Sequence, residues 1–96
     1  MIEIRQTEDF AKWFKHLKDR QARARIQARI DRMTLGGFGD CKPVGNGVSE
    51  MRVHYGSGYR VYFVQRGETL VILLAGGAKR TQNKDIQVAQ RLAENL

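Results

Sequence analysis

The first part of the chain shows two hydrophobic periods in succession. Ile2 and Ile4 alternate with charged neighbours, which is the period of a short, half-buried strand. Thr7 is suited to cap a helix, and four apolar residues then follow at i, i+3, i+4 and i+7, on one helical face. These residues are Phe10, Trp13, Phe14 and Leu17. We expect this stripe to belong to the core rather than to a surface that stacks on bases.

A second helix is predicted from about Asp19 to Leu35. Its buried face consists of Ala22, Ile26, Ile30 and Met33. Arginines cover the rest, and Arg25, Arg29 and Arg32 share one flank of the apolar stripe, because residues three and four apart lie on one side of a helix. These arginines either form a basic ridge for RNA or serve solubility and pairing with nearby aspartates. The two helices together are typical of an αα-hairpin.

Residues 36–47 break all periodicity, and they include Pro43, the only proline of the chain. This segment is therefore predicted to be a loop. Its glycines do not indicate a nucleotide cradle, because the segment follows a helix and contains neither GxGxxG nor the Walker GK[ST] pattern.

Three strand-like runs follow this segment. Val48–Tyr55 and Tyr59–Val64 are predicted to form a hairpin through Gly56-Ser57-Gly58. Thr69–Ala75 is the third predicted strand, and we expect Gly76-Gly77 to end it.

A basic loop, Ala78-Lys79-Arg80-Thr81-Gln82, precedes a closing helix capped near Thr81 or Asn83. The helix is marked by Ile86, Ala89, Ala93 and Leu96. The predicted order is β-α-α-β-β-β-α, an α+β fold. A chain of 96 residues holds one modest core, so we expect a single domain of residues 1–96.

Positive charge is the main feature of the composition. The 17 Lys and Arg residues exceed the 10 Asp and Glu residues, which gives a net charge of +7. Such a field attracts polyanions. Nucleic acid is the first candidate, followed by an acidic protein and an anionic membrane, and a basic solvated surface without a partner is the plain alternative.

Cysteine and histidine usage excludes several kinds of site. Cys41 is the only cysteine, so the chain has neither a disulfide framework nor a cysteine zinc site, and it fits a reducing cytoplasm. His16 and His54 lie on different predicted elements without a carboxylate at metal-ligand spacing, so we expect no metal and no other cofactor. No apolar run has the length of a signal-peptide core or a membrane span, which predicts a cytoplasmic protein without membrane contact.

Alternation along the predicted hairpin gathers polar side chains on one side of the sheet. Glu50, Arg52 and His54 share one face of the first strand. Arg60 and Tyr62 share the same side of its partner if the helices cover the opposite, apolar face. These residues are expected to stand together on a half-exposed surface. The alternative is an ordinary cross-strand ion pair of arginine with glutamate.

This set contains the groups that metal-independent RNA cleavage requires. Such an enzyme deprotonates a 2′-hydroxyl, stabilises a dianionic pentacoordinate phosphorus and protonates the 5′-leaving oxygen. Arginine suits the second task because its planar, permanently charged guanidinium matches phosphate oxygens. Glu50 or His54 is the candidate base. The candidates for the acid or an electrostatic helper are His54, Tyr62, Lys79 and Arg80.

A set of segments in a fixed order carries a resemblance over nearly the whole chain. The segments are Arg25–Met33, Gly39–Lys42, Gly47–Arg52, Gly58–Phe63 and Leu73–Ile86. Together they resemble the RelE/ParE superfamily of toxin–antitoxin toxins, and most closely its phage Gp49-like or HigB-like branch, the addiction-module killer proteins. The ordered set, rather than any one segment, is specific to this family.

The resemblance implies a helical hairpin packed on a twisted antiparallel sheet, and usually endonucleolytic cleavage of mRNA in the ribosomal A site. It assigns the sheet arginine of the family to Arg60 and the basic position of the preceding strand to Arg52. The arginine of the C-terminal loop falls on Arg80, with Lys79 beside it. Glu50 matches an acidic position that some members use as a base.

One position departs from the family pattern. Several ribosome-dependent members carry a tyrosine, or His-Tyr, near the start of the final helix, whereas Asn83-Lys84-Asp85-Ile86 has neither. The resemblance therefore does not identify the general acid. Either Lys84 or Gln82 helps to bind RNA there, or another residue protonates the leaving group.

The sequence thus predicts a type II toxin that acts as an mRNA interferase, an endoribonuclease that inhibits translation. Two alternatives stay open: a ParE-like inhibitor of DNA gyrase without nuclease activity, and a non-toxic RNA-binding module. The expected partners are mRNA, the ribosome and a cognate antitoxin of the helix-turn-helix type encoded adjacently. Contact with operator DNA is expected only through the antitoxin.

Overall fold

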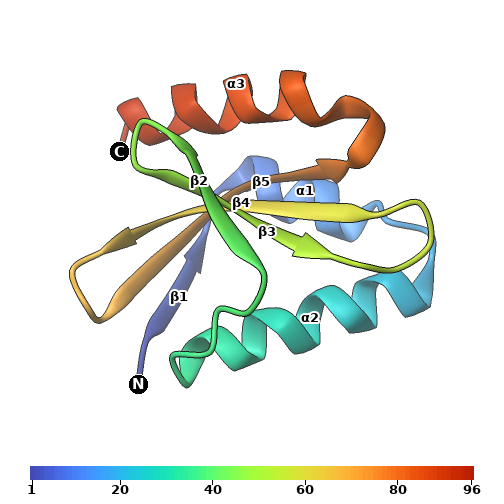
Figure 1. Ribbon diagram of the computed structural model, residues 1–96, viewed down its shortest axis with the longest axis horizontal. Helices are drawn as coiled ribbons and strands as arrows, with labels where there is room; N and C mark the ends of the chain where they lie inside the picture. Colours follow the sequence, from blue (N-terminus) through green and yellow to red (C-terminus); the bar gives the residue numbers. More distant parts are fainter.

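A five-stranded mixed sheet separates a helical hairpin from a C-terminal helix in the computed structural model, which describes residues 1–96 (Figure 1). The elements are β1 (Glu3–Gln6), α1 (Glu8–Lys15), α2 (Arg20–Thr34), β2 (Cys41–Gly45), β3 (Val48–Val53), β4 (Tyr59–Arg66), β5 (Leu70–Ala78), the 3₁₀ helix η1 (Lys79–Thr81) and α3 (Gln82–Glu94). The sheet order is β1-β5-β4-β3-β2, with β1 parallel to β5 and all other neighbours antiparallel. The predicted α+β class is confirmed. The predicted element order lacked one strand, and the sheet is mixed rather than all antiparallel.

The helical hairpin forms as its apolar periods predict. Thr7 caps α1, because its hydroxyl accepts the backbone N–H of Phe10 at 3.1 Å, and Asp19 caps α2 in the same way. Phe10 is buried, while the other aromatic residues of the stripe are partly buried against the same core. All four residues predicted for the inner face of α2 are buried: Ala22, Ile26, Ile30 and Met33.

β2 lies in the segment predicted to be a loop, so that prediction is wrong. Residues Cys41–Gly45 pair with β3 at the edge of the sheet. Pro43 is tolerated there because an edge strand has one unpaired side. The turn to β3 is Asn46-Gly47, with φ of 56° and 76°, which is the commonest signal for a tight hairpin. This dipeptide could have revealed the strand.

β5 continues through Gly76-Gly77 to Ala78, although the two glycines were predicted to end it. The two glycines allow other side chains to approach the strand backbone closely and do not end the strand. A Cβ at Gly76 would overlap the ring of Trp13, and a Cβ at Gly77 would overlap the carboxylate of Asp85. The strand therefore has no side chains where Trp13 of α1 and Asp85 of α3 pack on it.

A bulge in β5 ties the start of α1 to the sheet. Tyr62 pairs with Ala75 and Phe63 with Leu73, which leaves Leu74 without a partner. The carbonyl of Leu74 accepts a hydrogen bond from the hydroxyl of Thr7 at 2.6 Å. One threonine thus caps α1 and docks it on the strand that carries Gly76.

Both faces of the sheet are covered: Figure 1 shows α3 on one side and α2 on the other, and α1 shares the core on the α2 side. The core under the hairpin includes Met51, Val53, Val61, Phe63, Val71 and Leu73 from the sheet. A second core under α3 comprises Val48, Tyr62, Val64, Leu74, Ala75, Ala89 and Ala93. None of the helices combines the length and hydropathy that crossing a membrane requires. Because α3 covers this side of the sheet, the face that strand alternation predicted to be polar, with Glu50 and Tyr62, is partly buried.

Gly76→Ala is expected to lower the free energy of unfolding by about 1–3 kcal/mol, the usual cost of overpacking. The new Cβ would overlap the ring of Trp13. Urea unfolding followed by the fluorescence of Trp13, the only tryptophan, measures the change. Gly37→Ala is the control, because a Cβ there approaches no atom closer than 3.5 Å. Equal transition midpoints for Gly76→Ala and wild type would contradict this account.

Candidate functional site

Glu50 is the centre of a polar cluster between the sheet and α3, and its side chain is 0% exposed. Oε2 accepts hydrogen bonds from the Tyr62 hydroxyl at 3.2 Å and from Gln82 Nε2 at 2.8 Å. Oε1 accepts one from Arg52 Nε at 3.3 Å, and Arg60 Nε lies 3.4 Å from Oε2. Glu50 pairs directly with Tyr62 across β3 and β4, and Gln82 is the first residue of α3. Two strands and a helix therefore meet at one carboxylate.

Arg52 and Arg60 lie directly opposite each other on β3 and β4. Two like charges at such positions repel, and one carboxylate between them offsets only part of that charge. Their side chains are 31% and 12% exposed. Their contacts with Glu50 use only Nε, so the terminal nitrogens of both guanidinium groups stay available for phosphate oxygens.

A surface pocket of about 560 Å³ is lined by the arginine pair, by Lys79 and His54, and by the connection from Tyr55 to Tyr59. The backbone N–H of Lys79 donates to the carbonyl of Gly58 at 3.3 Å, which holds η1 against that connection. We call this the cationic pocket. Its three permanent or near-permanent positive charges come from separate elements.

His54 forms a pair with Asp40 at the cationic pocket. His54 Nε2 lies 2.6 Å from Asp40 Oδ2, and both side chains are exposed. The hydrogen bond from His54 is the main cause that lowers the pKa of Asp40, with smaller contributions from Arg52 and Arg29. Asp40 was not singled out from the sequence, because it lies just before β2, in the segment predicted to be a loop. A carboxylate beside His54 fixes which ring nitrogen carries the proton.

The pKa of Asp40 provides a test of this pair. In a carboxyl NMR titration the midpoint of Asp40 is expected below the ordinary value of about 3.9, and to rise toward it in His54→Ala. A lowered pKa in the folded state means that the pair stabilises the fold above the carboxyl range and that this contribution is lost on acidification. His16→Ala, which removes the other histidine, should leave the midpoint lowered. If the titration midpoint of Asp40 were the same in wild type and His54→Ala, the hydrogen bond between Asp40 and His54 would be excluded.

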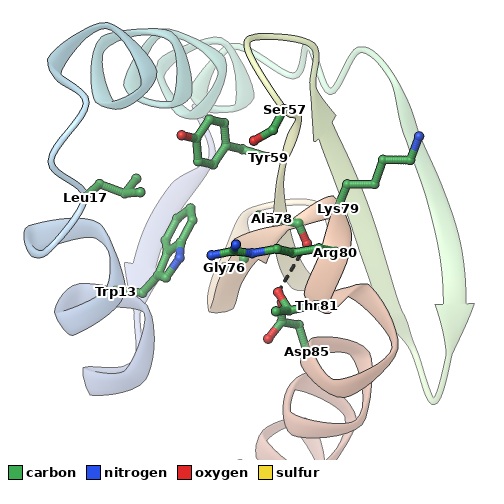
Figure 2. A pocket seen from close by; sticks show the side chains of 11 residues that line it. Trp13, Leu17, Ser57, Tyr59, Gly76, Ala78, Lys79, Arg80, Thr81 and Asp85 are labelled. Atoms are coloured by element: carbon green, nitrogen blue, oxygen red, sulfur yellow. Dashed lines mark hydrogen bonds between the residues drawn. The ribbon is translucent and has the colours of Figure 1, made fainter.

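A second pocket, of about 860 Å³, lies next to the first. We call it the aromatic pocket. Figure 2 shows Trp13 and Tyr59 at neighbouring positions along it, with Arg80 extending toward Trp13 and Lys79 pointing away. It is lined by Trp13, Leu17, Ser57, Tyr59, Gly76, Gly77, Ala78, Lys79, Arg80, Thr81 and Asp85. The two pockets share Ser57, Tyr59 and Lys79.

Comparison with known proteins identifies the family of the chain that carries these pockets. The family described as "Phage derived protein Gp49-like (DUF891)" matches residues 12–94, a span that includes every residue lining either pocket. The chain belongs to the Gp49-like family. It is also similar to an uncharacterized protein of Haemophilus influenzae, with 48% identity over 95 residues that cover 99% of this chain and 96% of the relative.

This Gp49-like protein brings together only part of the predicted set. Arg52, Arg60, Lys79 and His54 line one pocket, as alternation and the basic loop indicated. Arg80 lines the aromatic pocket instead, because the 3₁₀ turn of η1 directs neighbouring residues to different sides. No three His, Cys, Asp or Glu side chains come together in a way that would hold a metal ion.

The prediction that the polar face of the sheet is half-exposed is wrong for two residues. Glu50 and Tyr62 are both 0% exposed, because α3 packs over them. Burial, and then the neighbouring Glu50, raise the pKa of Tyr62 far above its usual range, so that its hydroxyl remains a donor. Gln82, predicted to bind RNA, turns inward to Glu50. The three side chains hydrogen-bond to one another, and Glu50 is too deep to deprotonate a 2′-hydroxyl in this structure.

The basic ridge predicted on α2 is interrupted in the Gp49-like fold. Arg29 points inward and donates hydrogen bonds to the carbonyls of Arg52 and Phe38, which fastens α2 to β3. The Arg25 guanidinium lies 4.9 Å from the centre of the Tyr55 ring. Arg32 is exposed, as is Lys84 in the first turn of α3. Only the exposed arginines and Lys84 remain candidates for contacts with RNA outside the pockets.

Proposed function

We propose that this protein is the toxin of a type II toxin–antitoxin system and that it cleaves mRNA on the ribosome. Membership of the Gp49-like family, which is associated with such systems, supports the first part. The arginine pair carries the second part: Arg52 and Arg60 face each other over one buried carboxylate at the wall of an open pocket. A pocket with this excess of positive charge favours a phosphodiester.

The arginines are proposed to stabilise the reacting phosphate. The terminal nitrogens of Arg52 and Arg60 bind its non-bridging oxygens, where negative charge grows in the pentacoordinate state. Glu50 is a positioning residue in this mechanism, because it contacts Nε of both arginines from below and has no access to substrate. This role replaces that of general base, for which Glu50 and His54 were the two candidates.

His54 is the proposed base. Nε2–H donates to Asp40, which leaves Nδ1 free to accept the proton of a 2′-hydroxyl. The 2′-oxygen then attacks phosphorus and the bond to the 5′-oxygen breaks, so the products are a 2′,3′-cyclic phosphate and a 5′-hydroxyl. Lys79, whose ammonium group also lines the pocket, supplies a proton to the 5′-oxygen.

A cognate antitoxin is part of the proposal. The charge of +7 and the open cationic pocket suit an acidic segment that covers Arg52 and Arg60. We expect this partner to be a helix-turn-helix protein encoded adjacently, through which alone the pair contacts operator DNA. Action on mRNA at the ribosome implies a cytoplasmic site of action. The absence of binding between the purified chain and the adjacent gene product would contradict this part.

Induced expression in bacteria, followed by mapping of mRNA 5′ ends, tests the function. The proposal expects growth arrest, new ends within codons of translated messages, and rescue by coexpressed antitoxin. Growth arrest with an SOS response and intact mRNA would instead identify an inhibitor of DNA gyrase. Normal growth at high expression would identify a non-toxic RNA-binding module.

A further inference from the structure

The aromatic pocket has no role in the mechanism above, yet it adjoins the cationic pocket. We propose that it binds one nucleobase of the RNA, with guanine preferred, while the neighbouring phosphate lies on the arginine pair. This inference rests on the proposed function, since it assumes an RNA substrate. Its volume of about 860 Å³ lies within the range of roughly 300–1,000 Å³ that is usual for small-molecule sites.

Stacking surfaces line the pocket. Trp13 of α1 and Tyr59 of β4 are both only partly buried, and they lie at neighbouring positions along it (Figure 2). Trp13 packs on the bare backbone of Gly76, where any side chain would displace its ring. Unpaired bases of single-stranded RNA stack on such aromatic faces and on arginine planes, and Arg80 extends toward Trp13.

Polar groups at one end of the pocket match the edge of guanine. Asp85 Oδ2 accepts a hydrogen bond from the hydroxyl of Thr81 at 2.6 Å, which orients the carboxylate. Asp85 Oδ1 makes no hydrogen bond within the chain, so it can accept N–H groups of a ligand. The Watson–Crick edge of guanine presents two N–H donors beside a carbonyl, which suits a carboxylate near the donor Arg80. Uracil presents carbonyls on both sides of a single N–H, and these would face the carboxylate.

The backbone of β5 adds further polar groups at the floor. The partner strand β1 ends at Gln6, which pairs with Leu73, so the outer edge of Gly76–Ala78 has no strand beside it. Alternate N–H and C=O groups of an unpaired edge point outward. The Trp13 ring and the Asp85 carboxylate fill the space that side chains would take at Gly76 and Gly77, which places a stacking surface and an acceptor against this strand.

The shared wall between the pockets favours a nucleotide over a peptide. Tyr59, Ser57 and Lys79 line both pockets, so a phosphate in one and its base in the other would lie on either side of this wall. Positive charge continues from the arginine pair through Lys79 to Arg80. A continuous cationic track that ends in a stacking surface is the combination used for single-stranded RNA.

Fluorescence of Trp13, the only tryptophan, reports on the pocket directly. The full chain is titrated with GMP, AMP, CMP and UMP and, for phosphate alone, with inorganic phosphate. Saturable quenching is expected with GMP at the lowest concentration and with UMP at the highest, and none with phosphate. Equal quenching by all four nucleotides, or none by any, would overturn the inference.

Asp85→Asn tests the source of the preference. It keeps the size of the side chain but replaces one acceptor oxygen with a donor, so the affinity for GMP is expected to fall at least 10-fold and the order among nucleotides to disappear. Asp31→Asn is the matched control, because Asp31 is an exposed aspartate of α2 that lines neither pocket. An unchanged preference in Asp85→Asn would overturn the assignment to guanine.

Mapped mRNA ends separate this inference from the proposed function. Suppose that wild type and Asp85→Asn both cleave mRNA with the same distribution of bases next to the cut. This result would contradict the base pocket and support the nuclease function. Quenching by GMP without any mRNA cleavage would support the base pocket and contradict the nuclease function. A Trp13 emission change on addition of the adjacent gene product, with none on addition of nucleotides, would assign the pocket to a partner peptide and overturn the inference.

Discussion

Arg60→Ala is expected to abolish growth arrest and to reduce mRNA cleavage by about 100- to 1,000-fold, the usual loss on removing one donor to a developing oxyanion. Arg60 is the less exposed of the opposed arginines, and its Nε lies 3.4 Å from Glu50 Oε2 as an ion pair. Cleavage by the purified protein on programmed ribosomes measures the effect. Arg66→Ala is the control, because Arg66 is an exposed arginine at the end of the same strand.

The same substitution leaves Glu50 buried with one arginine fewer, so a loss of activity must be separated from a loss of folding. The double variant Glu50→Gln with Arg60→Ala removes the charge of that carboxylate, which also removes the need for a counter-charge. A folded double variant is still expected to lack activity. If a folded Arg60→Ala protein cleaved mRNA as fast as wild type, Arg60 would have no catalytic role.

Glu50→Gln is expected to lower the free energy of unfolding by about 2–3 kcal/mol, within the range for losing charged hydrogen bonds. Every partner of Glu50 is a donor: the Tyr62 hydroxyl, the Gln82 amide and the Arg52 guanidinium. Glutamine replaces one carboxylate oxygen with an NH₂ group, and this group must face an arginine N–H in either orientation, because Arg52 Nε lies at Oε1 and Arg60 Nε at Oε2.

Denaturant unfolding measures this loss, with Glu68→Gln as the control, since Glu68 lies exposed in the turn between β4 and β5. The arginines also lose their anchor, so slower cleavage is expected in the fraction that stays folded. Equal stability of Glu50→Gln and wild type would show that the carboxylate does not organise the cluster.

The helices were predictable because the sequence signals that specify them, the apolar period and the cap residue, lie within or next to each helix. In α2 the four buried residues recur at the helical period, and Asp19 precedes them at the cap position, so the pattern needs no knowledge of the rest of the chain. The side of the sheet on which Arg52 and Arg60 lie was predictable for the same reason, since strand alternation is also local.

Which surfaces are covered was not predictable in the same way. Alternation places Glu50 and Tyr62 on one face but carries no information on whether α3 packs there. The Asp40–His54 pair depends on β2, which is held by backbone pairing at a sheet edge rather than by an apolar pattern. Gly76-Gly77 resembled a break because a glycine needed for close approach has the same sequence signature as one that ends a strand.

The contact between Gln82 and Glu50 has a consequence for the order of synthesis. The two residues are 32 positions apart, and the amide comes from the helix that leaves the ribosome after all five strands. Until α3 docks, Gln82 makes no hydrogen bond to Glu50, and the carboxylate that anchors the two guanidinium groups is open to water. A growing chain that has made every strand therefore still has an unassembled site, and the arginine pair reaches its final arrangement late in translation.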